Sequence, residues 1–390
     1  IYDDLARRDF TIDAMAIPLT SSSDQSIIDP HGGATDIGKQ EIRAISSKVF
    51  RDDPARLFRA IRLAANLDFR LEIKTRSWIK ENPSMILSVS PERIRDELLK
   101  LLSATSTTKW LRELDNLGLL PAIIPEIECL RGVAQPKEHY WDVFNHCIET
   151  PGKIEQILQS PDELNTTKLR ALREWTNIDQ YFARHASDGH SRLNLLKLAG
   201  LLHDISKPKT KTIEPTGRIR FFGHHTEGSK VAKGILSRLR FSRAGVDLVG
   251  TMIAHHLRPG QMAEKWKLPT DKAVYRFHRD LGGAAVDTVY LNLADYLAAR
   301  GPALEEDDWT YRLKVAERIL KYSPGRQENK EASRLVDGND IMTEFSIPSG
   351  PQIGELIAMV EEAQGIREVT TKQEAFKLVA RRLKAGGNGA

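Results

Sequence analysis

Histidines and aspartates recur along the middle of this 390-residue chain in a pattern that could hold a metal ion. His203 and Asp204 are adjacent in "LLHDISKP", directly after an apolar run that ends at Leu202. A single histidine in such a place is usually a core residue, but a carboxylate at a core edge is costly to bury without a cation. Imidazoles and carboxylates together are ligands for iron, manganese, zinc or nickel. The full series is His146, His203, Asp204, His224, His255, His256 and Asp295.

A second set of charged groups stands near the first residue, in "RRDFTIDAMA". Arg7, Arg8 and Asp9 lead into an apolar run that is typical of a strand. Such a charge run can be a solvated surface. Held at the entrance of a strand, however, the guanidinium groups could bind phosphates and the carboxylate a ribose hydroxyl.

The segment "DDPAR" offers a carboxylate and a guanidinium one helical turn apart. Pro54 suits the first position of a helix, so Asp52 or Asp53 is expected to cap it. Asp53 and Arg56 could form an ordinary surface ion pair. They also present an acceptor and a fork of donors, which could distinguish nucleotide bases by their hydrogen-bond pattern.

The elements that position these groups change character along the chain. Residues 10–45 are predicted to form short strands and turns, including a polar stretch "TSSSDQ" and the glycine pair of "DPHGGATDI". From residue 53 the apolar period becomes helical, with Leu57, Phe58 and Ile61 on one face. The opposite face carries Arg56, Arg59 and Arg62.

Helical patterns continue almost to the end of the chain. A polar stretch from about 159 to 190 interrupts them, and "KTKTIEPTGRIRFF" predicts a hairpin whose turn contains Pro215 to Gly217. The fold class is therefore mostly α, with a small mixed α/β part at the N-terminus.

Composition limits the choice of partners and compartment. The net charge of +4 permits a nucleic-acid partner only if the cations cluster. Two cysteines, Cys129 and Cys147, cannot form a disulfide framework, which indicates a reducing compartment such as the cytoplasm. No membrane partner is expected, because Lys197 interrupts the most apolar run before it reaches the roughly 18 residues that a membrane helix needs.

The order of "RRDFTIDAMA", "DPHGGATDI", "FRDDPARLFRAIRLAA" and "PERIRDELLKLL" resembles the bacterial class II tRNA nucleotidyltransferase and poly(A) polymerase family. The resemblance implies that ATP, CTP and tRNA are ligands and that CCA or part of CCA is added to tRNA 3′ ends, with poly(A) tailing as an alternative. Asp13 and Asp52 stand where the family commonly has Asn and Glu. The implied nucleotide-binding residues are Arg7, Arg8, Asp9, Asp53, Arg56, Arg59 and Arg62, and the implied flexible loop holds Asp29, Gly32, Gly33 and Asp36.

Nucleotidyl transfer also needs two Mg²⁺ ions about 4 Å apart, held by closely spaced carboxylates. Members of the family carry that pair in an Asp-x-Asp segment upstream of the "RRDF" motif. Before Arg7 this sequence has only the adjacent Asp3 and Asp4. We therefore expect an N-terminally truncated head, with the catalytic carboxylates upstream of residue 1 and no transfer activity in this chain alone.

The histidine and aspartate series resembles the HD phosphohydrolase domain, which one bacterial branch of these transferases carries. The resemblance implies a divalent transition metal on His146, His203, Asp204 and Asp295, and a second one on His224 with one or both of His255 and His256. His225 stands where related sequences often have an acid. Such a metal would activate water against a phosphoester. Metal-dependent hydrolysis of phosphomonoesters or cyclic phosphates is thus an alternative function, and non-catalytic RNA binding is another.

The two resemblances together imply four parts. They are a partial nucleotidyltransferase head at 1–48, an elongated helical neck at 49–122 that binds the base and RNA, an HD-type helical body at 123–305 and a helical tail at 306–390. In the tail, Asn339 replaces a common His.

A tRNA substrate needs cations that meet phosphates. Shape recognition of a folded RNA is favoured over base stacking, because few aromatic residues lie among the cations. The candidates are Lys207, Lys209, Lys211, Arg218 and Arg220, although each could simply be solvated.

Overall fold

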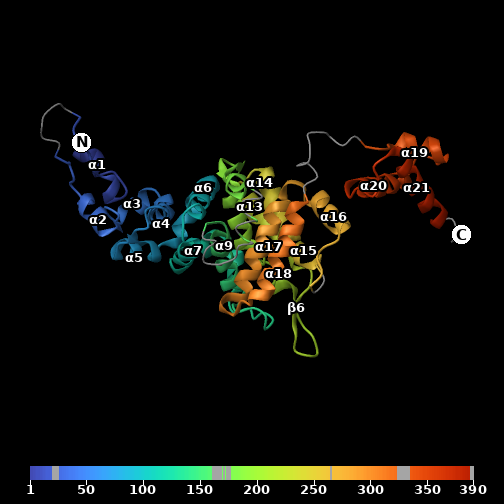
Figure 1. Cartoon of the computed structure of the whole chain (residues 1–390). Helices are drawn as coiled ribbons and strands as arrows, with labels where there is room; N and C mark the ends of the chain where they lie inside the picture. The colour runs from blue at the N-terminus through green and yellow to red at the C-terminus, as the bar shows by residue number, and fades with distance from the viewer. Residues whose placement is uncertain are drawn as a thin grey trace. The chain divides into compact units, whose positions relative to one another are not determined.

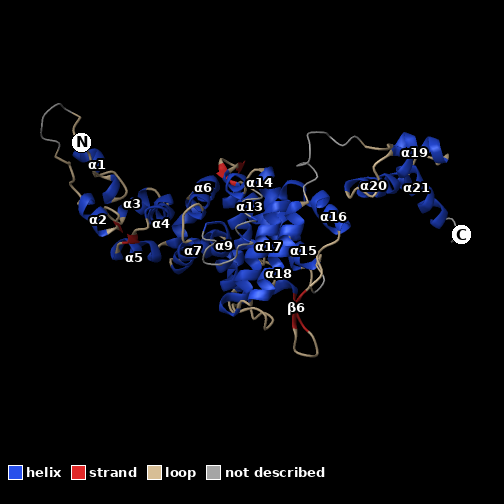
Figure 2. Ribbon diagram, viewed as in Figure 1, coloured by secondary structure: helices blue, strands red, loops and turns tan. Residues whose placement is uncertain are grey.

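The computed structural model describes residues 1–19, 26–159, 169, 172, 177–263, 266–322 and 334–386. The predicted polar turn at 20–25 lies outside these residues, as do residues 160–168, 170–171 and 173–176 of the predicted polar stretch at 159–190. The chain divides into two compact units, one of Ile1–Leu257 with Val286–Leu313 and the other of Arg258–Ala285 with Lys314–Ala390. Helices predominate, as Figure 2 shows, so the expected fold class is confirmed. Among the described helices, none is both long and apolar enough to cross a bilayer.

The first 45 residues contain less strand than the sequence predicts. Their elements are α1 (Tyr2–Leu5), the 3₁₀ turn η1 (Thr11–Asp13), α2 (Gly33–Lys39) and β1 (Glu41–Ile42). β1 pairs in parallel with β2 (Arg70–Leu71), and single bridges join Phe10 to Ala44 and Ala16 to Ile28. A strand needs a partner along its length. The expectation of several strands is therefore wrong for most of this segment, because its pieces meet only single bridging residues.

The next part of this unit is a stack of short helices around one long amphipathic helix, α4 (Ala55–Leu67) (Figure 1). Leu57, Phe58 and Ile61 on α4 are fully buried, and α4 packs against α6. The predicted amphipathic helix is thus confirmed. The surrounding elements are α3 (Lys48–Asp52), α5 (Ile73–Glu81), η2 (Pro83–Ser88), α6 (Pro91–Leu102), α7 (Thr107–Asn116), α8 (Leu119–Ile123) and η3 (Pro125–Leu130).

The remainder of the first unit packs around α12 (Arg192–Leu202), whose apolar residues are almost all buried. α12 contacts α9 (Val143–Gln159), α14 (Arg243–His255) and α6. The predicted hairpin is confirmed as β5 (Lys211–Ile213) and β6 (Ile219–Phe221), with Gly217 at a positive φ in its turn. The other elements are α11 (Ile178–Ala183), β3 (His185–Ser187), β4 (His190–Ser191), η5 (Pro208–Thr210), α13 (His224–Arg238), α17 (Ala285–Arg300), η7 (Gly301–Ala303) and α18 (Glu306–Lys321), of which α17 and α18 cross the unit boundary.

The second unit is helical throughout its described residues. Its core is formed by Ile341, Leu356 and Val360 with their apolar neighbours. Its elements are α15 (Arg258–Gln261), α16 (Asp271–Leu281), η6 (Gly282–Ala284), α19 (Gly338–Phe345), α20 (Pro351–Gly365) and α21 (Lys372–Gly386). The four-part division expected from the sequence stays a prediction.

Candidate metal centre and nucleotide pocket

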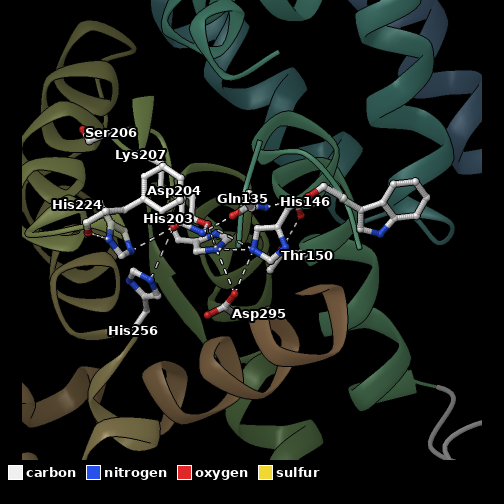
Figure 3. A network of polar contacts seen from close by, with 12 residues as sticks. Gln135, His146, Thr150, His203, Asp204, Ser206, Lys207, His224, His256 and Asp295 are labelled. Atoms are coloured by element: carbon white, nitrogen blue, oxygen red, sulfur yellow. Dashed lines mark hydrogen bonds and ion pairs between the residues drawn. The ribbon is translucent and has the colours of Figure 1, made fainter. Parts of the chain in front are cut away.

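Six members of the histidine and aspartate series meet inside the first unit (Figure 3). They come from distant segments: α9 carries His146, α17 carries Asp295, and His203 with Asp204 follows α12. His224 opens α13, and His256 directly follows α14. We call these six residues the His–Asp cluster.

The donor atoms of the His–Asp cluster lie within metal-binding distance of one another. His146 Nε2 lies 3.0 Å from Asp295 Oδ1 and 3.1 Å from His203 Nε2. Asp204 Oδ2 lies 3.2 Å from His203 Nε2, and Asp204 Oδ1 lies 3.4 Å from His224 Nε2. Two sets of donors could each hold one ion, namely His146 with His203 and Asp295, and His203 with Asp204 and His256.

Backbone carbonyls fix the orientation of three of these rings. Nδ1 of His203 donates to Gly200 O at 2.8 Å, Nδ1 of His224 to Phe221 O at 2.6 Å, and Nδ1 of His256 to Ile253 O at 2.7 Å. A histidine whose Nδ1 proton is held in this way keeps Nε2 available as a lone-pair donor. All three Nε2 atoms face the cluster, as metal ligands would.

Buried acceptors without hydrogen-bond donors support the same interpretation. Asp204 is 1% exposed, and although Lys207 Nζ lies 2.6 Å from its Oδ2, its Oδ1 accepts no hydrogen bond within the described residues. Nε2 of the buried His224 is equally unsatisfied. Such groups are costly unless a cation or donor meets them. The residues therefore fit a divalent transition metal, which would supply a Lewis acid there.

The electrostatics of the His–Asp cluster show how strongly it attracts positive charge. Burial lowers the pKa of His256 to about 3. Burial acts the same way on His203, but the Asp204 carboxylate outweighs it and raises the pKa of His203 well above its ordinary value. Burial would raise the pKa of Asp204, yet His203 and Lys207 hold that pKa well below the usual range. The buried Asp204 and the partly exposed Asp295 thus keep a proton on the His203 imidazole, a place that a metal ion could take.

Some members of the predicted site lie elsewhere, and others were missed. His255 belongs to neither metal-competent set among the described residues. Lys207 was predicted to meet RNA phosphates, but it is buried, and its Nζ lies 2.6 Å from Asp204 Oδ2 and 2.6 Å from Gln135 Oε1. That expectation is wrong, because the ammonium faces the His–Asp cluster. His139, which the sequence interpretation overlooked, lines the cavity beside the cluster.

The other expected RNA contacts lie on or beside the hairpin. Lys209 and Arg218 are exposed, whereas Lys211 and Arg220 are half-buried. Arg220 pairs with Glu214 at 3.0 Å. Arg218 and Arg220 line the same cavity as His139. The role of these cations in RNA binding stays a prediction.

The base-reading residues inferred from the sequence line a hollow at the start of α4. Asp53 accepts a bidentate pair of hydrogen bonds from the Arg93 guanidinium of α6, at 3.1 Å and 2.7 Å. It also accepts a hydrogen bond from the N–H of Ala55 at 3.2 Å. The Arg93 guanidinium, more than any other group, holds the pKa of Asp53 below its ordinary value. Arg56 does not pair directly with Asp53, since its Nη1 donates to Val49 O at 3.3 Å. Asp53, Arg56, Arg59 and Arg93 all line the hollow.

Asp9 connects the opening motif to the same helix face. Its carboxylate is buried and lies 3.3 Å from Arg59 Nε and 3.9 Å from Arg56 Nε. Arg62 instead pairs with Glu97 of α6 at 2.6 Å. Arg8 is exposed and pairs with Asp4 at 2.9 Å, and Arg7 is also exposed. Of the opening motif, Asp9 is thus the residue whose contacts reach the hollow.

The predicted flexible loop forms the start of α2. Asp29 accepts the N–H groups of Gly33 at 2.7 Å and Ala34 at 2.9 Å. Gly32 has φ +74°, and a Cβ on Gly33 would lie 2.2 Å from Thr11 O, so both positions require glycine. Asp36 is buried and accepts the Thr11 hydroxyl at 2.7 Å. These contacts tie the segment to η1, and its predicted role over a ligand is untested.

Comparisons with known proteins identify families and relatives that this chain resembles. Three family models match: "Poly A polymerase head domain" at residues 1–43, "Probable RNA and SrmB- binding site of polymerase A" at 68–130, and "HD domain" at 143–300. The A-adding tRNA nucleotidyltransferase of Deinococcus radiodurans is 30% identical over 388 residues, which cover 98% of this chain and 79% of that protein. The CC-adding tRNA nucleotidyltransferase of Thermus thermophilus is 27% identical, over 96% of this chain and 76% of that protein.

Solved structures show the same fold. The CCA-adding enzyme of Bacillus stearothermophilus in complex with CTP superposes with a TM-score of 0.59 at 20% identity, covering 100% of this chain and 76% of that one. The Thermotoga maritima CCA-adding enzyme complexed with tRNA gives a TM-score of 0.58 at 18% identity, over 98% and 74% of the two chains. The class is therefore that of tRNA nucleotidyltransferases with an HD domain. This chain belongs to the class II CCA-adding tRNA nucleotidyltransferase family.

Proposed function

We propose that this chain binds CTP or ATP in the hollow at the start of α4 and serves the addition of CCA, or part of CCA, to tRNA 3′ ends. The observation that carries this proposal is the grouping of Asp53, Arg56, Arg59 and Arg93 in one hollow, in a member of this family. tRNA as the partner also supports a cytoplasmic location.

The side chains that line the hollow can bind a nucleotide, but they do not themselves break a bond. Arg93 holds the Asp53 carboxylate in one orientation, so its remaining lone pairs can accept from the edge of a base. Arg56 adds guanidinium donors on the same face, and Arg59, itself positioned by Asp9, offers a charge to a phosphate. Mg²⁺ would supply the electrophilic assistance that transfer requires.

We further propose that a polypeptide of these 390 residues alone does not extend tRNA. Both metal-competent groups of three among the described residues lie in the His–Asp cluster, and the sequence contains no Asp-x-Asp. Incubation of the purified chain with tRNA lacking its CCA end, labelled CTP or ATP, and Mg²⁺ is expected to give no labelled product. Extension above a protein-free blank would contradict this prediction.

Nucleotide binding should nevertheless depend on Arg56. We expect Arg56→Ala to weaken CTP and ATP binding about 10-fold, because a hydrogen bond to a charged group contributes roughly 1.5–3 kcal/mol. Isothermal titration of the chain with each nucleotide measures this. Arg70→Ala is the matched control, since Arg70 is exposed on β2, beyond the C-terminal end of α4, and pairs with Glu41. Equal losses in the two variants would contradict the assignment.

The geometry of the His–Asp cluster favours a second function, metal-dependent hydrolysis of phosphate esters. Its support is the arrangement of three histidines and two aspartates in two overlapping sets of three donors, in a segment that matches the HD domain model. The metal would supply the Lewis acid, while His203, His146 and the two aspartates would hold it. Metal analysis of the purified protein and hydrolysis of p-nitrophenyl phosphate test this function. A metal-free and inert protein would count against it.

A further inference from the structure

A cavity of about 400 Å³ opens beside the His–Asp cluster. This volume is in the range of small-molecule sites, roughly 300–1,000 Å³. Four members of the cluster line it, namely Asp204, His224, His256 and Asp295. The β5–β6 hairpin, through Arg218 to Phe221, and the loop before α9, through His139, also line it. Whatever enters this cavity touches both the cluster and the hairpin.

The cations of the cavity are not equivalent. Lys207 is paired with Asp204, and Arg220 is paired with Glu214. Arg218 is exposed, and no ion pair or side-chain hydrogen bond engages its guanidinium within the described part of the chain. Arg218 is thus a positive charge at the cavity that is still free to bind an anion. A guanidinium fork matches two oxygens of a phosphate.

Apart from the exposed Glu138, the rest of the wall is largely apolar and aromatic. Ile219, Phe221 and Leu257 line the cavity, and Lys207 Nζ lies 5.3 Å from the centre of the Phe221 ring. Nδ1 of His139 is buried without a hydrogen-bond partner among the described residues, which leaves one unsatisfied polar atom in a residue that lines the cavity. An apolar wall with one free cation and one unsatisfied polar atom suits a ligand that has both a phosphate and a flat organic group.

We propose that the β5–β6 hairpin is the substrate-recognition element of the His–Asp cluster. In this assignment Arg218 binds the phosphate of a small aromatic phosphate ester and Phe221 packs against its ring. The proposal rests on the proposed hydrolytic function and names the substrate class of that site. It also replaces tRNA, the partner expected for the hairpin from the sequence, with a small molecule that the cavity can enclose.

The test uses the full 390-residue chain loaded with Mn²⁺, and phenylphosphonate, whose carbon–phosphorus bond resists hydrolysis. Isothermal titration is expected to show about 10-fold weaker binding in Arg218→Gln, as for loss of one charged hydrogen bond. Arg243→Gln is the matched control, because Arg243 is 96% exposed on α14, outside the cavity, and should bind like the parent chain. Methylphosphonate should bind several-fold more weakly than phenylphosphonate, and Phe221→Leu should reduce that difference.

Each outcome decides the proposal. Unchanged phenylphosphonate affinity in Arg218→Gln overturns the proposal. Loss of tRNA binding in Arg218→Gln with phenylphosphonate binding intact also overturns it, because the hairpin would then be assigned to RNA. Loss of phenylphosphonate binding in Arg56→Ala instead would place the ligand at α4 and also overturn it. If phenylphosphonate binds through Arg218 but p-nitrophenyl phosphate is not hydrolysed, the hydrolytic function fails while the recognition role of the hairpin stands.

Discussion

Replacement of Asp204 by asparagine is expected to weaken binding of a divalent transition metal by about 100-fold or more. Loss of a partner outside the ligand set commonly costs about 10- to 100-fold in metal affinity, and loss of a ligand should cost at least as much. Asp204 is central to the His–Asp cluster, because its two oxygens lie within 3.4 Å of His146, His203 and His224 nitrogens. An amide at this position would bring neither the charge nor the second acceptor oxygen.

The measurement is titration of the metal-free chain with Mn²⁺ or Zn²⁺, together with hydrolysis of p-nitrophenyl phosphate. Asp247→Asn is the matched control, since Asp247 is 57% exposed on α14 and pairs with surface cations. Asp204→Asn also removes the carboxylate that pairs with Lys207, which could destabilise the fold. His256→Gln removes one Nε2 and leaves that ion pair intact, so it should weaken the metal without unfolding the chain. Parent-like affinity in both variants would refute the metal centre.

The helices were predictable because their signal is local. On α4 the apolar and cationic residues repeat at the helical period within thirteen residues, so the buried face and the arginine face follow from the sequence alone. Strands depend on partners far along the chain, and no local pattern shows whether a partner is available. This is why the segment before residue 45 forms a 3₁₀ turn, a short helix and single bridges instead of the expected strands.

The His–Asp cluster was predictable as a set of residue types but not as a geometry. Six of the seven proposed members converge, whereas the choice between His255 and His256 depends on where α14 ends. Lys207 was misjudged because its charge is visible in the sequence, but the direction of the chain after α12 is not. The turn there places it three residues from Asp204 and aims its ammonium at that carboxylate. His139 stands in an irregular loop, where periodicity gives no signal.

Prediction of the contact that orients the Asp53 side chain requires both the sequence motif and the fold. The "PERIRDELLKLL" segment of the sequence resemblance forms α6, and Arg93 of α6 contacts Asp53. Which arginine of α6 would do so was not predictable. Arg93 and Arg95 are two residues apart on one helix, yet Arg95 turns away to Asp188 and the carbonyl of Arg240.

A buried ion pair supports the second large effect, which concerns stability. Lys197 of α12 is 0% exposed, and its ammonium lies 2.8 Å from Thr107 Oγ1 and 3.5 Å from Glu155 Oε2. Glu155 also accepts the N–H groups of Ser106 at 2.6 Å and Thr107 at 3.0 Å, where α7 begins. One carboxylate therefore offsets a buried charge and caps a helix at the same time.

We expect Glu155→Gln to destabilise the chain by about 3 kcal/mol, because removal of one partner leaves the other charge buried and unpaired. The melting temperature should fall by roughly 6–12 °C, at about 2–4 °C per kcal/mol for a unit of this size. Glu149→Gln on the same helix is the control. Its partner Arg112 is 37% exposed, so the expected loss is below about 1 kcal/mol. Adding Lys197→Met to Glu155→Gln should restore part of the stability, since the unpaired charge is then gone.

The same carboxylate gives the prediction a pH dependence of definite sign. Burial alone would raise the pKa of Glu155, but Lys197 and the groups at the start of α7 hold it below its ordinary value. A folded-state pKa below the unfolded value of about 4.3 means that the stabilisation is complete above that pH and is lost as the pH falls through the folded pKa. Thermal melts of the parent and Glu155→Gln chains should therefore differ most near neutral pH and converge below about pH 4. A gap that persists unchanged into acid would show that the carboxylate charge is not what stabilises this junction.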